Sequence, residues 1–464
     1  MTARHPLWRV LALFAALSIV AAACGDDEES STTGAEDTES ETEAGASDTE
    51  EPSESASEEP SEGAGEASLA GMKGTLPLLD LEDDFKARMD EIDPDLGGTY
   101  NYGAESYDAV VVITLAAIVA GSDGIEYASE INEVTRNGEK CTDFAACRTL
   151  AEAGTDFDYD GVSGPMDFSG NGEPTIGSYG VQQFTEDNMI DDSLTEYVVA
   201  EAPESADVPA VPVVGDRAGD GVLTIGTLLP ETGNLAFLGP PEIAAVQLGI
   251  SEVNSAGGFN GADVALVTGD SGDVENGIAN QTVDRLLQAN VDGIIGAASS
   301  GVTLTVIDKI TSAGVVQFSP ANTSTALSDY DDKGLYFRNA PADVLQGNVL
   351  GEVIAADGNA TVALLVLDDP YGESLADQLE ESLSASGSEV VARVVYDPAA
   401  TQFDAEVQEA AAEDPDAVVL IGFDESSRIL NTMVEESIGP QDVAVYGVDG
   451  NMGNALGERF AAGT

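Results

Sequence analysis

Residues 221–233 read GVLTIGTLLPETG, and this stretch decides the fold. It is a short apolar run that ends in a turn sequence. The apolar members are Val222, Leu223, Ile225, Leu228 and Leu229, and the turn residues are Pro230, Thr232 and Gly233. An apolar run with these boundaries, followed by a helical pattern, is typical of a buried parallel strand. We therefore predict that this strand starts a series of strand–helix units.

The rest of the chain keeps this alternation. We predict further strands at 264–268, 293–296, 315–319, 362–367, 390–396, 417–422 and 443–448. Helical stripes separate them, for example over 241–254, where apolar residues recur at spacings of three and four. Alternating β and α elements predict doubly wound parallel sheets. The pattern restarts near residue 340, so we predict an α/β fold with a first lobe at 221–340 and a second at 341–464.

Residues 71–200 precede this series and have a different pattern. We predict helices at 83–92, at 107–120 (apolar enough to be buried) and near 127–135, with another around 149–153. The run 156–179 is rich in Gly and Asp and predicts short strands with tight turns. Its acidic residues, Asp158, Asp160, Asp167 and Glu173, lack the spacing of a twelve-residue calcium loop, so we interpret them as solvated carboxylates. A Pro-punctuated linker follows at 201–220.

The beginning of the chain has the features of an export signal. Residues 10–23 are an apolar run of fourteen, whereas a membrane-spanning helix needs about 20. The run ends in Ala21-Ala22-Ala23-Cys24, which resembles the bacterial lipoprotein box. We expect a signal peptide over 1–23, lipidation of Cys24 and an extracytoplasmic, cell-membrane lipoprotein. A plain secretory signal that is cleaved nearby is the alternative.

Residues 24–70 predict an acidic tether. Positions 25–67 hold 17 Asp or Glu residues and no Lys, Arg or aromatic residue, so this segment cannot bury enough apolar surface to offset its ordering entropy. The whole chain has a formal net charge of −70. This charge argues against nucleic acid as a partner and against anionic lipid headgroups, so we expect membrane contact through the lipid anchor only.

The residue types that are scarce also limit the chemistry. The only His is His5, inside the expected signal peptide, so Ser-His-Asp and Cys-His catalysis and His-based metal sites are excluded after cleavage. Cys141 and Cys147 are close together in an exported chain, and we predict a local disulfide between them. A reactive thiol or a metal-binding pair is the alternative. We expect no cofactor and no metal.

Several stretches together resemble type I periplasmic substrate-binding proteins, in particular the leucine/isoleucine/valine-binding branch that serves ABC importers. In the second part of the chain they are GVLTIGTLLPETG, GIIGAASSGVTLTV, VVQFSPANTST, FRNAPADVLQGN, DDPYGES and VYGVDG. GMKGTLP, AESYDAV and DYDGVSGPMDFSGNGEP resemble the C-terminal third of the same family. The resemblance implies two lobes that are joined by hinge strands.

The order of these stretches differs from that of the family. In the family the GMKGTLP-like part comes last, whereas here it comes first, so we interpret the order as a circular permutation. The linker at 201–220 would join the original ends, and 71–200 would complete both lobes. A truncated tandem gene or an assembly error is the alternative.

The resemblance implies a set of ligand-binding residues at the carboxyl ends of strands, where open α/β sheets bind ligands. Ser299 and Ser300 start a helix whose N-terminus suits a ligand carboxylate. Asn322 and Thr323 match the positions where the family uses a backbone carbonyl and a Thr hydroxyl. Simple helix capping by Ser and Thr is the alternative.

The second lobe is expected to supply the other wall. Tyr371, Phe423 and Asp449 each follow a predicted strand, and Asp449 matches the acidic residue that pairs with the ligand ammonium. Asp is shorter than the Glu of relatives. Leu238 matches a position where relatives place an aromatic ring against the ligand side chain.

These residues predict a function in capture of a small solute. We expect a monomeric solute-binding protein that closes on an amino acid, of the branched-chain type or a similar zwitterion, and delivers it to an ABC permease. A sensor for amides, urea-like solutes or small carboxylates is the alternative. A carboxylate-dependent hydrolase is a more remote one, because the chain has no nucleophile elbow of the GxSxG kind. We do not expect an enzyme.

Overall fold

The computed structural model describes residues 67–203 and 208–463. The expected signal peptide, Cys24 and nearly all of the expected tether lie outside these residues. Within the described part, two sheets contain the strands of the two lobes, and a third, smaller sheet is hydrogen-bonded to neither but packs on the core of the first lobe.

The first lobe contains a parallel five-stranded sheet in the order β11-β10-β9-β7-β8. The predicted strands are confirmed within one or two residues. They are β7 (Thr224–Leu228), β8 (Ala265–Val267), β9 (Gly293–Gly296) and β10 (Val316–Ser319). The sequence pattern did not indicate β11 (Tyr336–Arg338), because this short strand ends in a charged residue and shows no apolar run. The helices are α4 (Gly239–Ser255), α5 (Ile278–Gln288) and α6 (Ser300–Ser312).

The second lobe contains a seven-stranded sheet in the order β13-β12-β14-β15-β1-β5-β6. Its predicted strands are also confirmed: β12 (Thr361–Leu367), β13 (Glu389–Tyr396), β14 (Ala417–Ile421) and β15 (Ala444–Gly447). The helices are α7 (Asp343–Ala356), α8 (Pro370–Ser386), α9 (Asp404–Ala411), α10 (Ser426–Glu435) and α11 (Asn454–Ala462). The sheet is parallel from β13 to β1, but β5 and β6 run antiparallel, so it is mixed and not wholly parallel as expected.

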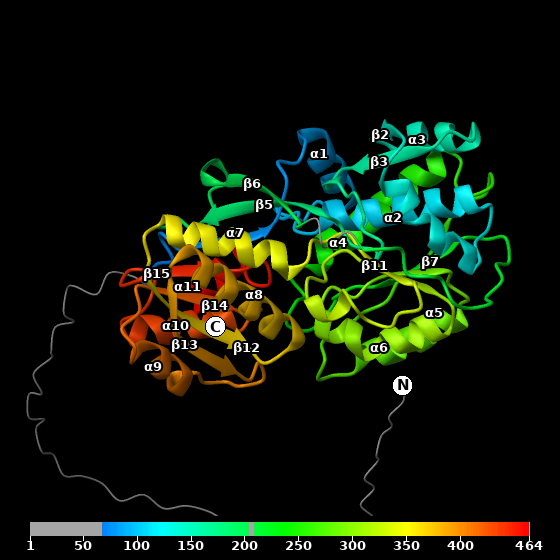
Figure 1. The fold of residues 1–464 in the computed structure, drawn as a ribbon. Helices are drawn as coiled ribbons and strands as arrows, with labels where there is room; N and C mark the ends of the chain where they lie inside the picture. Colours follow the sequence, from blue (N-terminus) through cyan, green and yellow to red (C-terminus); the bar gives the residue numbers. More distant parts are fainter. Residues whose placement is uncertain (1–66, 204–207, 464) are drawn as a thin grey trace, which may run out of the picture. The chain divides into compact units, whose positions relative to one another are not determined.

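Residues of the N-terminal segment supply three strands of this second sheet. They are β1 (Lys73–Pro77), β5 (Ile176–Gln183) and β6 (Glu196–Glu201). β1 pairs with β15 in parallel, with Gly74 opposite Gly447, and with β5 in antiparallel. A Cβ at Gly74 would lie 2.8 Å from the Gly447 carbonyl oxygen, and this close approach of two backbones requires glycine. In Figure 1, β5 and β6 lie beside α7 on the lobe that is drawn in orange and red.

The same segment also supplies the core helix of the first lobe. α2 (Gly103–Ala120) begins four residues before the predicted start, and 15 of its 18 residues are buried. It packs against α4 (Figure 1), where Val110 contacts Gly249. By length and composition α2 could span a bilayer, but 83% of it is buried within the fold. Its apolar surface is therefore that of a core helix.

The remaining elements of the N-terminal segment are short. α1 (Asp83–Ile92) has the predicted bounds, and α3 (Phe144–Glu152) begins earlier than predicted. The predicted helix near 127–135 is wrong, since the chain forms two 3₁₀ helices, η1 (Ile125–Glu130) and η2 (Glu133–Thr135). The Gly- and Asp-rich run gives β3 (Phe157–Gly161), β4 (Gly164–Pro165) and the start of β5. β3 and β4 join β2 (Glu139–Cys141) in a small sheet.

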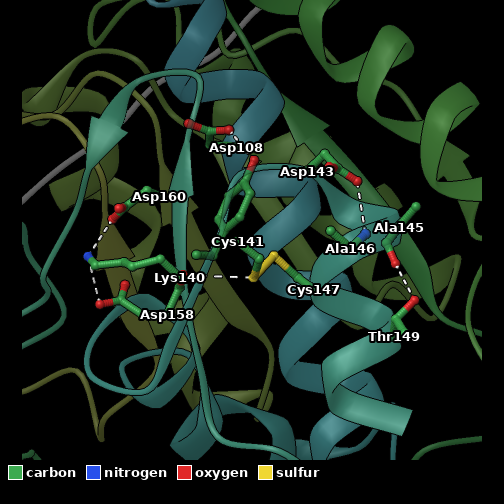
Figure 2. The surroundings of a disulfide bond; sticks show 11 residues. Asp108, Lys140, Cys141, Asp143, Ala145, Ala146, Cys147, Thr149, Asp158 and Asp160 are labelled. Carbon is green, nitrogen blue, oxygen red and sulfur yellow. Dashed lines mark hydrogen bonds and ion pairs between the residues drawn. A yellow bond between two sulfur atoms is a disulfide. The ribbon is translucent and has the colours of Figure 1, made fainter. Parts of the chain in front are cut away.

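The disulfide between Cys141 and Cys147 connects β2 with α3 (Figure 2), as predicted. The Cα atoms of the two cysteines are 5.4 Å apart. The Asp143 side chain accepts a hydrogen bond from the Ala146 N–H at 2.8 Å and caps α3 between them. Lys140 forms ion pairs with Asp158 and Asp160, each at 2.8 Å. These two carboxylates therefore brace a small sheet.

The first residue of the expected linker, Glu201, ends β6, and residues 208–217 are bound to the first lobe and to the N-terminal segment. The Gly170 N–H donates to the Val208 carbonyl, and the Val211 N–H donates to the Gly170 carbonyl, both at 3.0 Å. Further along, the Arg217 guanidinium pairs with the buried Asp292 carboxylate at 2.7 Å. Residues 208–220 thus form a strap along one lobe.

We predict that replacing both Cys141 and Cys147 with Ser lowers the free energy of unfolding by about 2 kcal/mol, because the disulfide closes a short loop in the unfolded chain. Denaturant unfolding of the wild type and the double variant measures this. Wild type with reductant should match the double variant, and identical midpoints with and without the disulfide would contradict the prediction.

Candidate functional site

The first wall of the site is the connection between β9 and α6. The Ser299 side chain accepts a hydrogen bond from the Val302 N–H at 3.2 Å and caps the helix, so the alternative of helix capping holds for this residue. The Ser300 hydroxyl is buried and accepts from the Ser324 N–H at 3.3 Å. Both serines line a cavity that opens at the start of α6. The first turn of the helix therefore faces this cavity.

Asn322 and Thr323 lie behind this wall and do not line the cavity. The Asn322 amide donates to the carbonyls of Ala297 and Ala298 at 3.1 and 2.7 Å and accepts from the Tyr336 hydroxyl at 3.0 Å. Its side chain thus connects two loops of the first lobe. The Thr323 carbonyl accepts from the Asp343 N–H, which begins α7.

The second wall is built around Asp449, which follows β15. Its carboxylate accepts hydrogen bonds from the hydroxyls of Tyr102 and Tyr371, both at 2.7 Å. Tyr371 also stacks on Phe423, with ring centroids 5.4 Å apart and an interplanar angle of 12°. Burial raises the pKa of Asp449, and the two tyrosine hydroxyls partly oppose this shift.

Six of the eight predicted ligand-binding residues meet at one small cavity, whose free space of about 20 Å³ has room for one water molecule. We call this the ligand cavity. Its wall consists of Tyr102, Leu235, Leu238, Ala298, Ser299, Ser300, Ala321, Tyr371, Phe423, Asp449 and Gly450. One side is the N-terminus of α6 and the opposite side is a carboxylate, with apolar and aromatic groups between them. This arrangement suits a small solute with separated negative and positive ends.

Tyr102 was not predicted as a site residue. It lies in the N-terminal segment, at the start of α2, with a left-handed φ of 57°. It is separated from Asp449 by 347 residues along the chain. The prediction drew on strand ends of the two lobes, whereas Tyr102 precedes a helix. The tyrosine-rich run of Tyr100 and Tyr102 before a buried helix was the one available signal.

A larger cleft of about 310 Å³ adjoins the ligand cavity and shares Leu235, Ser299 and Phe423 with it. Among the described residues that line it, four are acidic and none is basic: Asp273, Glu275, Asp368 and Asp369 are the acidic ones. Asp369 caps α8 by accepting from the Tyr371 N–H at 2.7 Å. Burial raises the pKa of Asp369 to about 6, against the effect of its backbone hydrogen bonds.

A buried ion pair supports the loop behind the first wall. Arg338 is fully buried and pairs with Glu173, which comes from the N-terminal segment. The same guanidinium donates to the carbonyl of Ser324 at 2.8 Å and to the hydroxyl of Ser328 at 2.8 Å. Burial disfavours the Glu173 carboxylate, but the adjacent guanidinium outweighs this effect and lowers the pKa of Glu173.

Comparison with known proteins identifies the family. Residues 222–464 match the sequence profile of the periplasmic binding protein family, which is more than half of the chain. The chain belongs to this family. It is a type I periplasmic binding protein of the leucine/isoleucine/valine-binding branch. The family consists of solute-binding proteins and not of enzymes.

Individual relatives cover only part of the chain. A chemotactic signal transduction system substrate-binding protein, BasB of Halobacterium salinarum, is 28% identical over 242 residues, which are 50% of this chain and 56% of the relative. Leu/Ile/Val-binding protein homolog 1 of Brucella abortus is 32% identical over 183 residues, which are 39% and 48% of the two chains. This periplasmic binding protein thus spans about half the length of the curated relatives that it matches.

Among solved structures, the branched-chain amino acid transporter substrate binding protein LivJ of Streptococcus pneumoniae, in complex with isoleucine, is 27% identical with a TM-score of 0.46. The match covers 52% of this chain and 68% of that chain. A leucine binding protein LivK of Thermotoga maritima is 21% identical with a TM-score of 0.45, and the match covers 52% and 67%.

We predict that Glu173→Ala lowers the free energy of unfolding by about 3 kcal/mol or more, because it leaves the Arg338 charge buried without a counterion. Urea unfolding measures the loss. Glu133→Ala is the matched control, since Glu133 pairs with Arg136 but its side chain is 56% exposed, and it should cost less than about 1 kcal/mol. Equal losses in the two variants would contradict the prediction.

Proposed function

We propose that this periplasmic binding protein is an extracytoplasmic solute-binding protein that captures an amino acid between its lobes and delivers it to an ABC importer. The observation that carries the proposal is the ligand cavity, whose wall combines the N-terminus of α6 with the Asp449 carboxylate and lies between the two lobes. The printed names of relatives support it, since they describe Leu/Ile/Val-binding proteins and a complex with isoleucine.

In the proposed complex, the two ends of a zwitterion bind opposite walls. The ligand carboxylate lies at Ser299 and Ser300, where free N–H groups and the helix dipole favour an anion. The ligand ammonium pairs with Asp449. The side chain of a branched-chain amino acid, or of a similar small zwitterion, packs on Leu238, Tyr371 and Phe423. Both charges lose water in the cavity, so each has to be paired.

Lobe closure is the proposed mechanism, and direct hydrogen bonds already connect the two lobes. The Ser324 hydroxyl, in the first lobe, donates to the Pro370 carbonyl at the start of α8 at 2.9 Å. The Thr325 N–H donates to the Ser374 hydroxyl, also at 2.9 Å. These contacts lie next to the ligand cavity, so ligand binding and closure stabilise the same arrangement. The importer would bind this closed form.

The proposal includes a membrane anchor, with lipidation at Cys24 and the acidic segment 24–70 as a tether. Membrane contact would be through the lipid only, and the protein would act as a monomer. A second candidate is a sensor that presents its solute to a signalling partner. It is supported by the similarity to the chemotactic substrate-binding protein of Halobacterium salinarum. Both candidates use the same ligand cavity.

We also propose that the segment order is a circular permutation. Two observations support this: the profile match begins only at residue 222, and β1, from the preceding segment, lies between β15 and β5. The strap before β7 would then be the connection between the original ends. The division into 71–200, 201–220, 221–340 and 341–464 follows from this proposal.

We predict that at least one α-amino acid raises the melting temperature of the purified chain. A ligand at 100 times its dissociation constant adds about 2.7 kcal/mol, or about 3 °C for a chain of this size. A thermal-shift screen with branched-chain amino acids, other amino acids, amides and small carboxylates measures this. Asp449→Asn should abolish the shift, because it removes the counter-charge of the ammonium. A cooperative transition that no amino acid moves would contradict the proposed function.

We predict that residues 221–464 alone show no cooperative unfolding, because β15 loses β1 and α4 loses α2. Circular dichroism during thermal unfolding measures this. A chain in which residues 68–203 follow 221–464 is the matched control, and it should unfold cooperatively and bind the same solute. Cooperative unfolding of the shorter chain would overturn the proposed permutation.

A further inference from the structure

Asp343, the first residue of α7, is a second buried acidic residue, and it is joined to the loop behind the cavity wall, where the Ser324 N–H donates to the Ser300 hydroxyl. It is completely buried, and its N–H donates to the Thr323 carbonyl at 2.8 Å. Neither of its carboxyl oxygens has a hydrogen-bond partner among the described residues. The hydroxyls of Thr323 and Ser374 lie close enough to favour the carboxylate, but neither reaches it in hydrogen-bonding geometry. The Ser374 hydroxyl instead accepts a hydrogen bond from the Thr325 N–H at 2.9 Å.

The groups that face Asp343 do not balance its charge. Asp449, in the cavity wall, repels it, while Tyr371 from α8 and Tyr179 from β5 are neutral. Within the described part of the chain, the guanidinium that acts on Asp343 is that of Arg338, and this guanidinium is already paired with Glu173. Two buried carboxyl groups therefore share one region without a free cation.

Such a pair cannot hold two negative charges at low cost. A buried carboxylate without a counterion takes up a proton instead, and two neighbouring acids titrate as a pair. Burial is the main cause that raises the pKa of Asp343, to about 7, and the Asp449 charge adds to it. The pKa of Asp449 is raised as well, again mainly by burial. In the empty cavity, the pair thus keeps a proton near neutral pH.

We propose, on the basis of the proposed function, that Asp343 is the second acidic residue of the ligand site and makes binding selective for solutes that carry an ammonium group. The empty pair holds one proton and one negative charge. When an ammonium group binds at Asp449, its positive charge compensates a second carboxylate, and the proton leaves Asp343 for solvent. A solute of the same shape without the ammonium group brings no such compensation, so it binds weakly.

The first test follows the proton in the empty protein. The folded chain keeps a proton that the unfolded chain releases above about pH 4, so this term makes the wild type less stable as pH rises from about 4 to 7. Asp343→Asn removes this proton and with it the pH-dependent contribution to stability. We expect its melting temperature to exceed that of the wild type by a margin that grows over this pH range and is constant above it. A margin that does not change with pH would overturn the proposal.

The second test uses L-leucine and its hydroxy analogue, 2-hydroxy-4-methylpentanoate, as probes between pH 5.5 and 8.5. For the wild type, we expect the affinity for L-leucine to rise up to about tenfold per pH unit below pH 7, because one proton is released on binding. In Asp343→Asn the affinity should not depend on pH in this range. The hydroxy analogue should bind at least tenfold more weakly than L-leucine at pH 8.

Glu242→Gln is the matched control. Glu242, in α4, is also completely buried, and its carboxyl oxygens have no hydrogen-bond partner among the described residues. Burial raises its pKa, and Glu105 is the charged group that acts on it. The control should change stability with pH in the same sense but leave the pH dependence of L-leucine binding as in the wild type. If Glu242→Gln also lost the pH dependence of L-leucine binding, the proposed role of Asp343 would be overturned.

The outcomes separate this inference from the proposed function. Binding of L-leucine with an affinity that is independent of pH, or equal binding of the hydroxy analogue, would overturn the inference and leave the solute-binding function in place. If L-leucine and every other amino acid of the screen fail to bind, both the proposed role of Asp343 and the proposed function are overturned.

Discussion

Strand β1 is hydrogen-bonded along both of its edges, to β15 on one side and to β5 on the other. Without it, β15 would expose an unpaired edge in the interior of the second lobe, and β5 and β6 would have no sheet to join. Buried backbone groups have to find partners, so this pairing is a condition for the whole lobe. The rest of the structure depends on this condition, because the segment that supplies β1 also supplies α2 to the other lobe.

This segment is therefore part of the candidate site as well as of both cores. Tyr102 binds Asp449, and Glu173 pairs with the buried Arg338, which holds the loop of residues 322–324. Both contacts join residues that are more than 160 positions apart in the chain. The geometry of the cavity is thus fixed by the same long-range packing that completes the lobes.

Charge is the second constraint on this molecule. The chain has 86 acidic and 16 basic residues, so few cations are available for the interior. Arg338 is used for Glu173, and Arg217 is used for Asp292. Asp343 and Asp449 are left with hydroxyl groups or with no partner. A buried carboxyl group that has no cation beside it stays neutral unless a cation binds next to it. A ligand ammonium group would be such a cation.

The local pattern of the sequence was sufficient to predict much of the fold. The predicted strands of both lobes lie within two residues of the observed ones, and the disulfide forms between the predicted cysteines. Apolar runs and turn residues are local signals, so they locate strands that have such a run, even the three residues of β8. They failed for β11, which ends in a charged residue, and for residues 127–135, where the chain forms 3₁₀ turns.

The features of the candidate site also fall into two groups, those that the sequence indicated and those that only the tertiary structure decided. Sequence resemblance by itself indicated the family, the two-lobed α/β fold and six residues of the cavity wall, because each of its motifs is a short contiguous stretch and five of the six residues follow the end of a strand. Only the tertiary structure placed Asn322 and Thr323 behind the wall, brought Tyr102 to Asp449 and left Asp343 without a counterion. These features depend on hydrogen bonds and on burial between distant segments. Such contacts form only when the two lobes share the N-terminal segment, and no local sequence pattern encodes them.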